Sequence, residues 1–185
     1  MTRDPEATKR RIVEAAIELH TTIGPANTTV SAVAERAGVQ RLTLYRHFPR
    51  PEDLFDACVT LGWEWFPPPD MGRWRQTADP EARLRHALGE LYAYYDRVGD
   101  AFLVLVRDFP RVPALARLNE PYFARWDDMR DVLAVGWGRR GRRRRLLVAA
   151  LEHSLDLATW ESLVRRRGLS SQDAVELLVR LVSST

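Results

Sequence analysis

The chain has 185 residues, of which 45% are hydrophobic and 29% are charged. This composition excludes disordered, collagen-like and coiled-coil proteins and suits one globular body with a small extra module. Apolar runs such as Phe102–Val106 fall far short of the roughly 20 residues that span a bilayer, and the first residues carry no secretory h-region. The single cysteine, Cys58, excludes an internal disulfide and a thiolate zinc site. We therefore expect a cytoplasmic protein that makes no membrane contact.

The excess positive charge lies in the first 50 residues. The whole chain has a formal net charge of +3, and residues 1–50 carry all of it, with eight cations against five anions. Basic excess on one segment is typical of contact with a polyanion, although many ordinary modules carry as much. Charge alone leaves nucleic-acid binding and a solvated surface equally open.

Helical periodicity recurs along the chain, whereas strand-like alternation never lasts more than a few residues, so we predict an all-α fold of about nine helices. The first helix is predicted to begin at Asp4-Pro5-Glu6, where a capping acid precedes a proline, and to end at Gly24-Pro25. Its buried row is expected to be Ile12, Ala16, Leu19 and Ile23.

Two short helices separated by a glycine turn are predicted next. The second helix begins after Thr29, a good N-cap, and ends before the Gly38 turn. The third helix covers Gln40–Phe48 with Leu44 and Phe48 facing inward, and a fourth covers Glu52 to Trp65.

The prolines at 67–69 form a stiff break before the distal region. Distal helices are predicted over Pro80–Val98, Asp100–Phe109, Pro113–Trp137, Arg142–Arg167 and Ser171–Val182. The last begins with a capping box formed by Ser170 and Asp173.

The glycine-separated pair has the parts of a helix-turn-helix motif. An α-helix fits the major groove, arginine and glutamine hydrogen-bond to guanine and adenine edges, and leucine contacts the thymine methyl group. The outer face of the third helix offers Gln40, Arg41, Leu42, Thr43, Tyr45 and Arg46. Thr29, Tyr45 and His47 are suited to donate hydrogen bonds to phosphates. The alternative is a solvated helix pair in an ordinary bundle.

The segment TVSAVAERAGV at 29–39, followed by TLYRHF at 43–48 and EDL at 52–54, resembles the DNA-binding segment of TetR-type transcriptional regulators. The resemblance covers about residues 10–55. It implies a homodimer in which each subunit presents one reading helix, and a larger C-terminal domain that binds a small molecule and dimerises. We therefore divide the chain into a DNA-binding domain, 1–55, and a ligand-binding and dimerisation domain, 56–185.

The resemblance also implies roles for single residues of the DNA-binding segment. The phosphate contacts fall on Thr29, Thr43, Tyr45 and His47, and the variable base-reading positions fall on Gln40, Arg41 and Leu42. Three positions depart from the family pattern. Pro51 stands where many members have a phosphate-gripping lysine, with Arg50 beside it. Gln40 replaces a Ser or Thr cap, and Leu42 replaces a small residue. These departures bear on the operator sequence.

Aromatic residues are dense in the distal region, and aromatic walls with few polar anchors enclose apolar or cationic ligands. The expected lining of an effector cavity is Tyr95, Phe102, Tyr122 and Trp126, on helices that the family places around its cavity. The alternative is that these rings are core.

Small and apolar residues at helical spacing on the last two helices favour close helix approach, and two copies would form a four-helix interface. The predicted interface residues are Leu147, Ala150, Leu151, Ser154, Ala158, Ala174, Leu177, Leu178 and Leu181. The alternative is an intrachain core.

Enzyme motifs are missing: the sequence contains no H-E-x-x-H, G-x-S-x-G or P-loop pattern, and its four histidines show no metal-ligand spacing. We predict a DNA-binding transcriptional regulator without cofactor or metal, most simply a repressor that binds a palindromic double-stranded operator as a homodimer. An apolar or aromatic small molecule is expected to release it. The alternative is a helical small-molecule-binding or protein-interaction module that binds no DNA.

Overall fold

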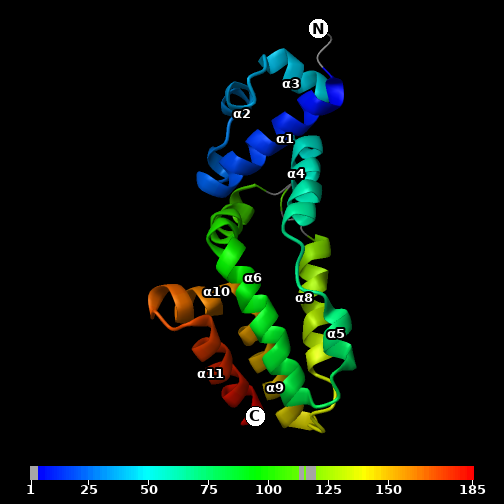
Figure 1. Cartoon of the computed structure of the whole chain (residues 1–185), viewed down its shortest axis with the longest axis vertical. Helices are drawn as coiled ribbons and strands as arrows, with labels where there is room; N and C mark the ends of the chain where they lie inside the picture. The colour runs from blue at the N-terminus through cyan, green and yellow to red at the C-terminus, as the bar shows by residue number, and fades with distance from the viewer. Residues whose placement is uncertain (1–3, 113–114, 116–119) are drawn as a thin grey trace. The chain divides into compact units, whose positions relative to one another are not determined.

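The computed structural model describes residues 4–112, 115 and 120–185, with the side chains of 120–123 excepted, and all its regular structure is helical (Figure 1). This confirms the predicted all-α fold. No helix in these residues combines the length and the apolar character that a bilayer span requires.

The chain forms two compact units. Unit 1 consists of Met1–Pro67 with Ala101–Glu120, and unit 2 consists of Pro68–Asp100 with Pro121–Thr185. The helix α6, Pro80–Asp108, contributes residues to both. The predicted division into a DNA-binding domain, 1–55, and a ligand-binding and dimerisation domain, 56–185, stays a prediction.

Unit 1 contains the predicted helix-turn-helix pair. Its elements besides the end of α6 are α1 (Pro5–Thr22), η1 (Pro25–Asn27), α2 (Val30–Arg36), α3 (Arg41–His47), α4 (Pro51–Trp65) and η2 (Phe109–Arg111). Asp4 caps α1 as predicted, accepting a hydrogen bond from the Glu6 amide at 3.0 Å. The helix α1 packs against both α2 and α4 (Figure 1). Their shared core includes Ile12, Ala16 and Cys58.

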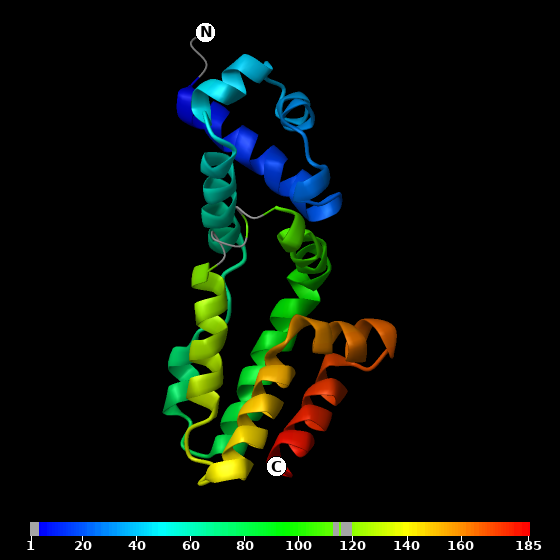
Figure 2. The same cartoon turned by 180° about the vertical axis from the view of Figure 1, so that it is seen from behind.

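Unit 2 is a bundle with a dense aromatic core. Its elements besides most of α6 are α5 (Met71–Gln76), α8 (Glu120–Leu133), α9 (Gly141–Leu155), α10 (Leu157–Trp160), η3 (Glu161–Arg166) and α11 (Ser171–Ser183). The axes of α6, α8 and α9 run alongside one another in both ribbon views (Figure 2). Trp74, Tyr92, Tyr95 and Trp160 are all completely buried there.

The predicted break between Val98 and Asp100 is wrong, because α6 continues through Gly99. A Cβ atom added at Gly99 would overlap the indole ring of Trp160. Gly99 therefore serves close packing between α6 and α10, and its lack of a side chain does not end the helix.

The predicted single helix from Arg142 to Arg167 is also wrong. The helix α9 ends at Leu155, and the Asp156 carboxylate then accepts from the Ala158 amide at 2.8 Å to cap α10. The segment Glu161–Arg166 continues as a π-helix. The last helix was predicted correctly, and Ser170 accepts from the Asp173 amide at 3.0 Å.

Three smaller differences concern helix ends and burial. The short helix α5 was not predicted. The helix α8 ends at Leu133 instead of Trp137, and residues 113–114 and 116–119 of that predicted helix lie outside the described part. Ile23 is 44% exposed because α1 stops one residue earlier, which removes Ile23 from the predicted buried row.

We predict opposite effects of alanine at two glycines of α6. Gly99→Ala should lower the free energy of unfolding by about 1–3 kcal/mol, because the methyl group overlaps Trp160. Gly89→Ala, where an added Cβ meets no atom within 4 Å, should raise it by roughly 0.5–1 kcal/mol. Urea unfolding followed by circular dichroism measures both. Equal stabilisation by the two substitutions would contradict the packing role of Gly99.

Candidate nucleic-acid interface

Capping residues set the ends of the helix-turn-helix pair. The Thr29 hydroxyl accepts from the Ala32 amide at 3.1 Å and begins α2. Gly38 then adopts a φ of +63°, a left-handed conformation that glycine tolerates best. In this turn the Val39 amide donates to the Ala34 carbonyl at 2.9 Å, which closes α2 directly before α3.

Two buried side chains fix the rotation of α3. Leu44 is 2% exposed and Phe48 is 4% exposed, and both belong to the core of unit 1. The opposite face is therefore turned to solvent, and Leu42 is 71% exposed and Tyr45 44%. Exposure of a leucine to this extent is costly on a plain surface and suits a contact with an apolar group such as a thymine methyl.

The arginines on this face are available for a ligand. Neither Arg41 nor Arg46 takes part in an ion pair with any described residue, and both are exposed. Neighbouring arginines of unit 1 are paired instead: Arg36 with Glu18 and Arg50 with Asp53. Lys9 and Arg11 on α1 are likewise exposed and outside every ion pair of the described residues, so the unneutralised positive charge of unit 1 is shared by α1 and α3, where a polyanion would meet it.

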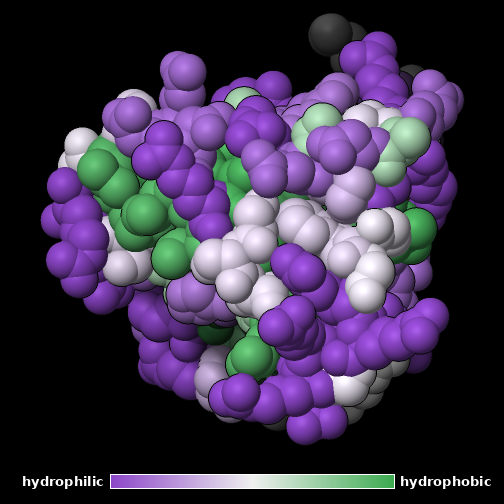
Figure 3. All heavy atoms as spheres, turned by 90° about the horizontal axis from the view of Figure 1, so that it is seen from below, coloured by the Kyte–Doolittle hydropathy of each residue, from purple (hydrophilic) through white to green (hydrophobic). Residues whose placement is uncertain are grey.

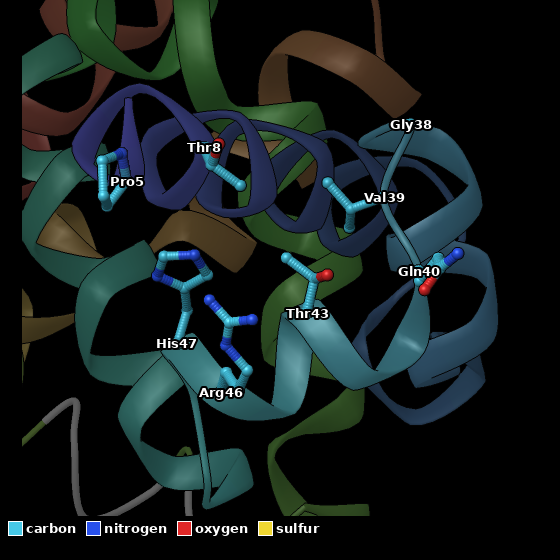
Figure 4. A pocket seen from close by; sticks show the side chains of 8 residues that line it. All are labelled: Pro5, Thr8, Gly38, Val39, Gln40, Thr43, Arg46 and His47. Atoms are coloured by element: carbon cyan, nitrogen blue, oxygen red, sulfur yellow. The ribbon is translucent and has the colours of Figure 1, made fainter. Parts of the chain in front are cut away.

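A depression of about 600 Å³ lies between α3 and the first turns of α1 (Figure 4). Four predicted site residues line it, namely Gln40, Thr43, Arg46 and His47, together with Pro5, Thr8, Gly38 and Val39. Amide, hydroxyl, guanidinium and imidazole groups of this kind bind phosphate oxygens. The depression joins part of the predicted set, whereas Arg41, Leu42 and Tyr45 are exposed outside it.

Sequence reasoning did not find Pro5 and Thr8, the two residues that α1 adds to this depression. Thr8 is buried, and its hydroxyl donates to the Asp4 carbonyl at 3.0 Å. Nothing in the sequence near Thr8 signals a functional role, since its place beside α3 depends on how α1 crosses the pair.

The two departures at helix starts have visible consequences. Gln40 stands at the N-cap of α3 and makes no capping hydrogen bond, as expected for glutamine, so its amide is free to contact a base or phosphate. Pro51 is the first residue of α4, and Arg50 before it pairs with Asp53 at 2.5 Å. This contact lowers the pKa of Asp53 and raises that of Arg50. Arg50 is exposed, so the pairing leaves it on the surface.

His20 supports α1 against α4 and adds no charge to the interface. Its ring is stacked on Phe55 with centroids 5.1 Å apart. Burial lowers the pKa of His20 from 6.5 to about 4, so the ring is neutral at neutral pH.

The residues predicted to line an effector cavity have different surroundings. Tyr95 is completely buried in unit 2, donates to the Leu155 carbonyl at 2.8 Å and meets Trp126 edge-on with ring centroids 6.2 Å apart. Phe102 belongs to unit 1 and is partly buried. The side chain of Tyr122 lies outside the described residues. The structure thus brings together Tyr95 and Trp126 of this set.

Most residues predicted for a dimer interface are already buried within unit 2. Those with little accessible surface left for a partner are Leu147, Leu151, Ser154, Ala174 and Leu178. Ala150 is partly accessible and Ala158 is exposed, as are Leu177 at 40% and Leu181 at 53%. Leu146, which was not predicted, is 44% exposed on α9. Five of the nine predicted residues thus serve the intrachain core, and the large apolar side chains that remain exposed on α9 and α11 are Leu146, Leu177 and Leu181.

Figure 3 shows one face of the molecule, on which hydrophilic side chains predominate and apolar side chains form separate patches. A second basic segment, Arg142–Arg145, is exposed at the start of α9. Cations at a helix N-terminus oppose the helix dipole, so this segment does not stabilise its own helix.

Comparison with known proteins places these features in context. Residues 12–58 match the N-terminal model of the bacterial regulatory proteins of the tetR family. The match contains α2, the Gly38 turn and α3, together with most of α1 and about half of α4.

Solved structures resemble the whole chain. A Clostridium perfringens protein described as a regulator of fatty acid metabolism shares 19% identity over 95% of this chain and 98% of its own, with a TM-score of 0.69. FadR from Bacillus subtilis, in complex with stearoyl-CoA, shares 16% over 95% and 97%, with a TM-score of 0.63. A TetR-like regulator from Rhodococcus sp. RHA1 shares 20% over 95% and 93%, with a TM-score of 0.59. At these identities the likeness establishes a common fold.

Proposed function

We propose that this chain, whose residues 12–58 match the N-terminal model of the tetR family of bacterial regulatory proteins, is a homodimeric repressor that binds a palindromic operator and releases it when a small apolar effector binds. The observation that carries the proposal is the outer face of α3. There Arg41, Leu42 and Tyr45 are exposed above the buried Leu44 and Phe48. A regulator of this kind acts on chromosomal DNA in the cytoplasm.

We divide the interface into residues that read bases and residues that hold phosphates. Gln40, Arg41 and Leu42 occupy the start of α3, the end of a reading helix that meets base edges. Thr29, Thr43, Tyr45 and His47 have hydroxyl or imidazole groups suited to phosphates, and phosphate contacts fix the orientation of the helix without reading sequence. Arg46, in the depression beside α1, adds charge for the backbone.

The length of α3 supports a dimer. Its seven residues extend about 10 Å along the helix axis, which spans roughly three base pairs. So short a site recurs throughout any genome, so one copy would not select an operator. Two copies related by a two-fold axis would place their reading helices one DNA turn apart, about 34–36 Å, and read twice as many base pairs.

The proposed dimer surface consists of the exposed apolar residues of the last two long helices. These are Leu146 on α9 with Leu177 and Leu181 on α11, and α9 packs against α11 within the chain. Each of these side chains exposes at least 40% of its surface to water in the single chain, so association would remove apolar surface from solvent.

The proposed effector is apolar. Of the predicted lining, Tyr95 and Trp126 meet within unit 2 and are the residues that we propose for effector contact. The stearoyl-CoA bound by FadR of Bacillus subtilis supports a ligand of this character. An effector that binds the non-operator conformation weakens operator binding by the same factor as DNA weakens effector binding.

The division of roles predicts different effects for two substitutions on α3. With a duplex selected from a random-sequence pool by the wild-type protein, Arg41→Ala should cost about 1–3 kcal/mol and remove the preference at one base position. Tyr45→Phe should weaken all sequences alike, by roughly 0.5–1.5 kcal/mol. Fluorescence anisotropy on the duplex and its single-base variants measures both.

Arg75→Ala, which removes an exposed arginine from α5, is the charge-matched control and should leave the base preferences unchanged. The same loss of base preference in Arg41→Ala and Tyr45→Phe would refute the roles. Selection of no duplex by the wild type would refute the function and favour a helical module that binds no DNA.

The dimer proposal predicts that Leu177→Glu with Leu181→Glu converts the protein to monomers, because the two carboxylates would have to be desolvated at the interface. Sedimentation velocity should give twice the 21.3 kDa chain mass for the wild type and the single mass for this variant. Val135→Glu, at a residue that is 60% exposed outside these helices, should leave the dimer intact. A dimeric Leu177→Glu, Leu181→Glu variant would place the interface elsewhere.

A further inference from the structure

The last residue of α6, Asp108, has a carboxylate that is completely buried. Aspartate is almost never fully buried unless its charge is paired, so the burial needs a reason. Its surroundings lie in unit 1, and one of its contacts joins it to a segment more than 80 residues earlier in the chain.

The Asp108 carboxylate accepts hydrogen bonds from two residues and forms an ion pair with a third. The Ala26 amide donates to it at 3.0 Å, the Arg107 Nε donates at 3.0 Å, and Arg111 forms an ion pair at 3.6 Å. The contact with Arg107, followed by the Ala26 amide, holds the pKa of Asp108 below its usual value, so the carboxylate is ionised at neutral pH. Arg107 also donates to the Ile23 carbonyl at 3.2 Å.

These contacts surround one turn, Gly24–Ala26, which joins α1 to α2. Gly24 has a φ of +92°, and a Cβ added there would overlap both the Asp108 carboxylate and the Arg107 guanidinium. The turn therefore lies directly against the end of α6, and a side chain at Gly24 would have to displace both groups as well as adopt a positive φ, which glycine tolerates best. We call this set of contacts, from Arg107 and Asp108 to Ile23, Gly24 and Ala26, the Asp108 clasp.

The turn leads directly to the helix-turn-helix pair. The Thr28 hydroxyl donates to the Gly24 carbonyl at 2.9 Å, and Thr29 is the cap that begins α2. Only Asn27 and Thr28 separate Ala26 from that cap, so a shift of the turn moves the start of α2. Because α2 and α3 share a buried core, α3 would move with it.

We infer that Asp108 is a positioning residue for DNA reading, through which α6 sets the orientation in which α3 meets a duplex. The inference rests on the proposed function, since it concerns how the same interface is held in position.

Positioning and plain stabilisation affect DNA binding differently. Sequence-specific binding needs side chains aligned with base edges, whereas non-specific binding is mainly an electrostatic interaction with phosphates. A misplaced α3 therefore loses specific affinity while non-specific affinity is retained. A smaller folded fraction lowers both affinities by the same factor. The ratio of the two affinities separates the two roles.

The test compares Asp108→Asn with Asp131→Asn by fluorescence anisotropy on the wild-type-selected duplex and on a scrambled duplex of equal length. Asp131 is exposed on α8 and paired with Arg130, so its substitution makes the same change of charge away from the clasp. Asp108→Asn should lower specific affinity about tenfold and leave non-specific affinity unchanged. Asp131→Asn should change neither affinity beyond the small effect of charge.

Gly24→Ala disturbs the same contact from the side of the turn and should lower specific affinity in the same way. It replaces Asp108→Asn in the test if circular dichroism shows that Asp108→Asn folds poorly. Asp108→Ala, which also removes the acceptor for the Ala26 amide, should lower the specific affinity for the selected duplex further than Asp108→Asn does. Equal behaviour of Asp108→Asn and Asp131→Asn would overturn the inference, as would a parallel fall in specific and non-specific affinity. If the wild type itself selects no duplex, the proposed function fails and the inference fails with it. If the wild type selects a duplex and Asp108→Asn binds it as tightly as the wild type does, only the inference fails.

Discussion

The burial of Leu44 and Phe48 beneath α3 is the contact on which the DNA-reading surface depends. A helix of seven residues has no independent stability in water, because isolated helices shorter than about 12 residues are marginal. Burying two large apolar side chains contributes roughly 1.5–3 kcal/mol each, which holds α3 in place and sets its rotation. The outward direction of Arg41, Leu42 and Tyr45 is therefore a consequence of the core beneath them.

The surroundings of α3 extend this constraint in two directions. On one side the first turns of α1 form a depression with α3 that contains hydrogen-bond donors for a backbone phosphate. On the other side the turn between α1 and α2 is held by the buried Asp108. A short helix that its core contacts hold, and whose partner α2 begins at a fixed turn, can present side chains with the accuracy that base recognition requires, and a small change at that turn can alter its position.

Local signals in the sequence were sufficient for α1 to α4, because these helices begin and end at strong caps and turns such as Asp4, Thr29 and Gly38. They were insufficient where distant residues decide. Gly99 reads as a helix break until Trp160 is placed against it, and Asp156 lies within a periodic run that gives no sign of its capping role. Helical periodicity also cannot distinguish a core face from an interface. For this reason Leu147 and Leu151 were predicted for a dimer surface, although they are buried within the chain.

The central claim concerns which surface meets DNA, because α3 is one of several exposed basic segments among the described residues, and Arg142–Arg145 at the start of α9 is the most arginine-rich of the others. Amide chemical shifts of the isotope-labelled wild-type protein, recorded during titration with a duplex that it has selected, report the contact surface directly. The account predicts that the largest perturbations fall within residues 29–48 and that those at 142–145 stay small. Perturbations concentrated at 142–145, with α3 unaffected, would contradict it.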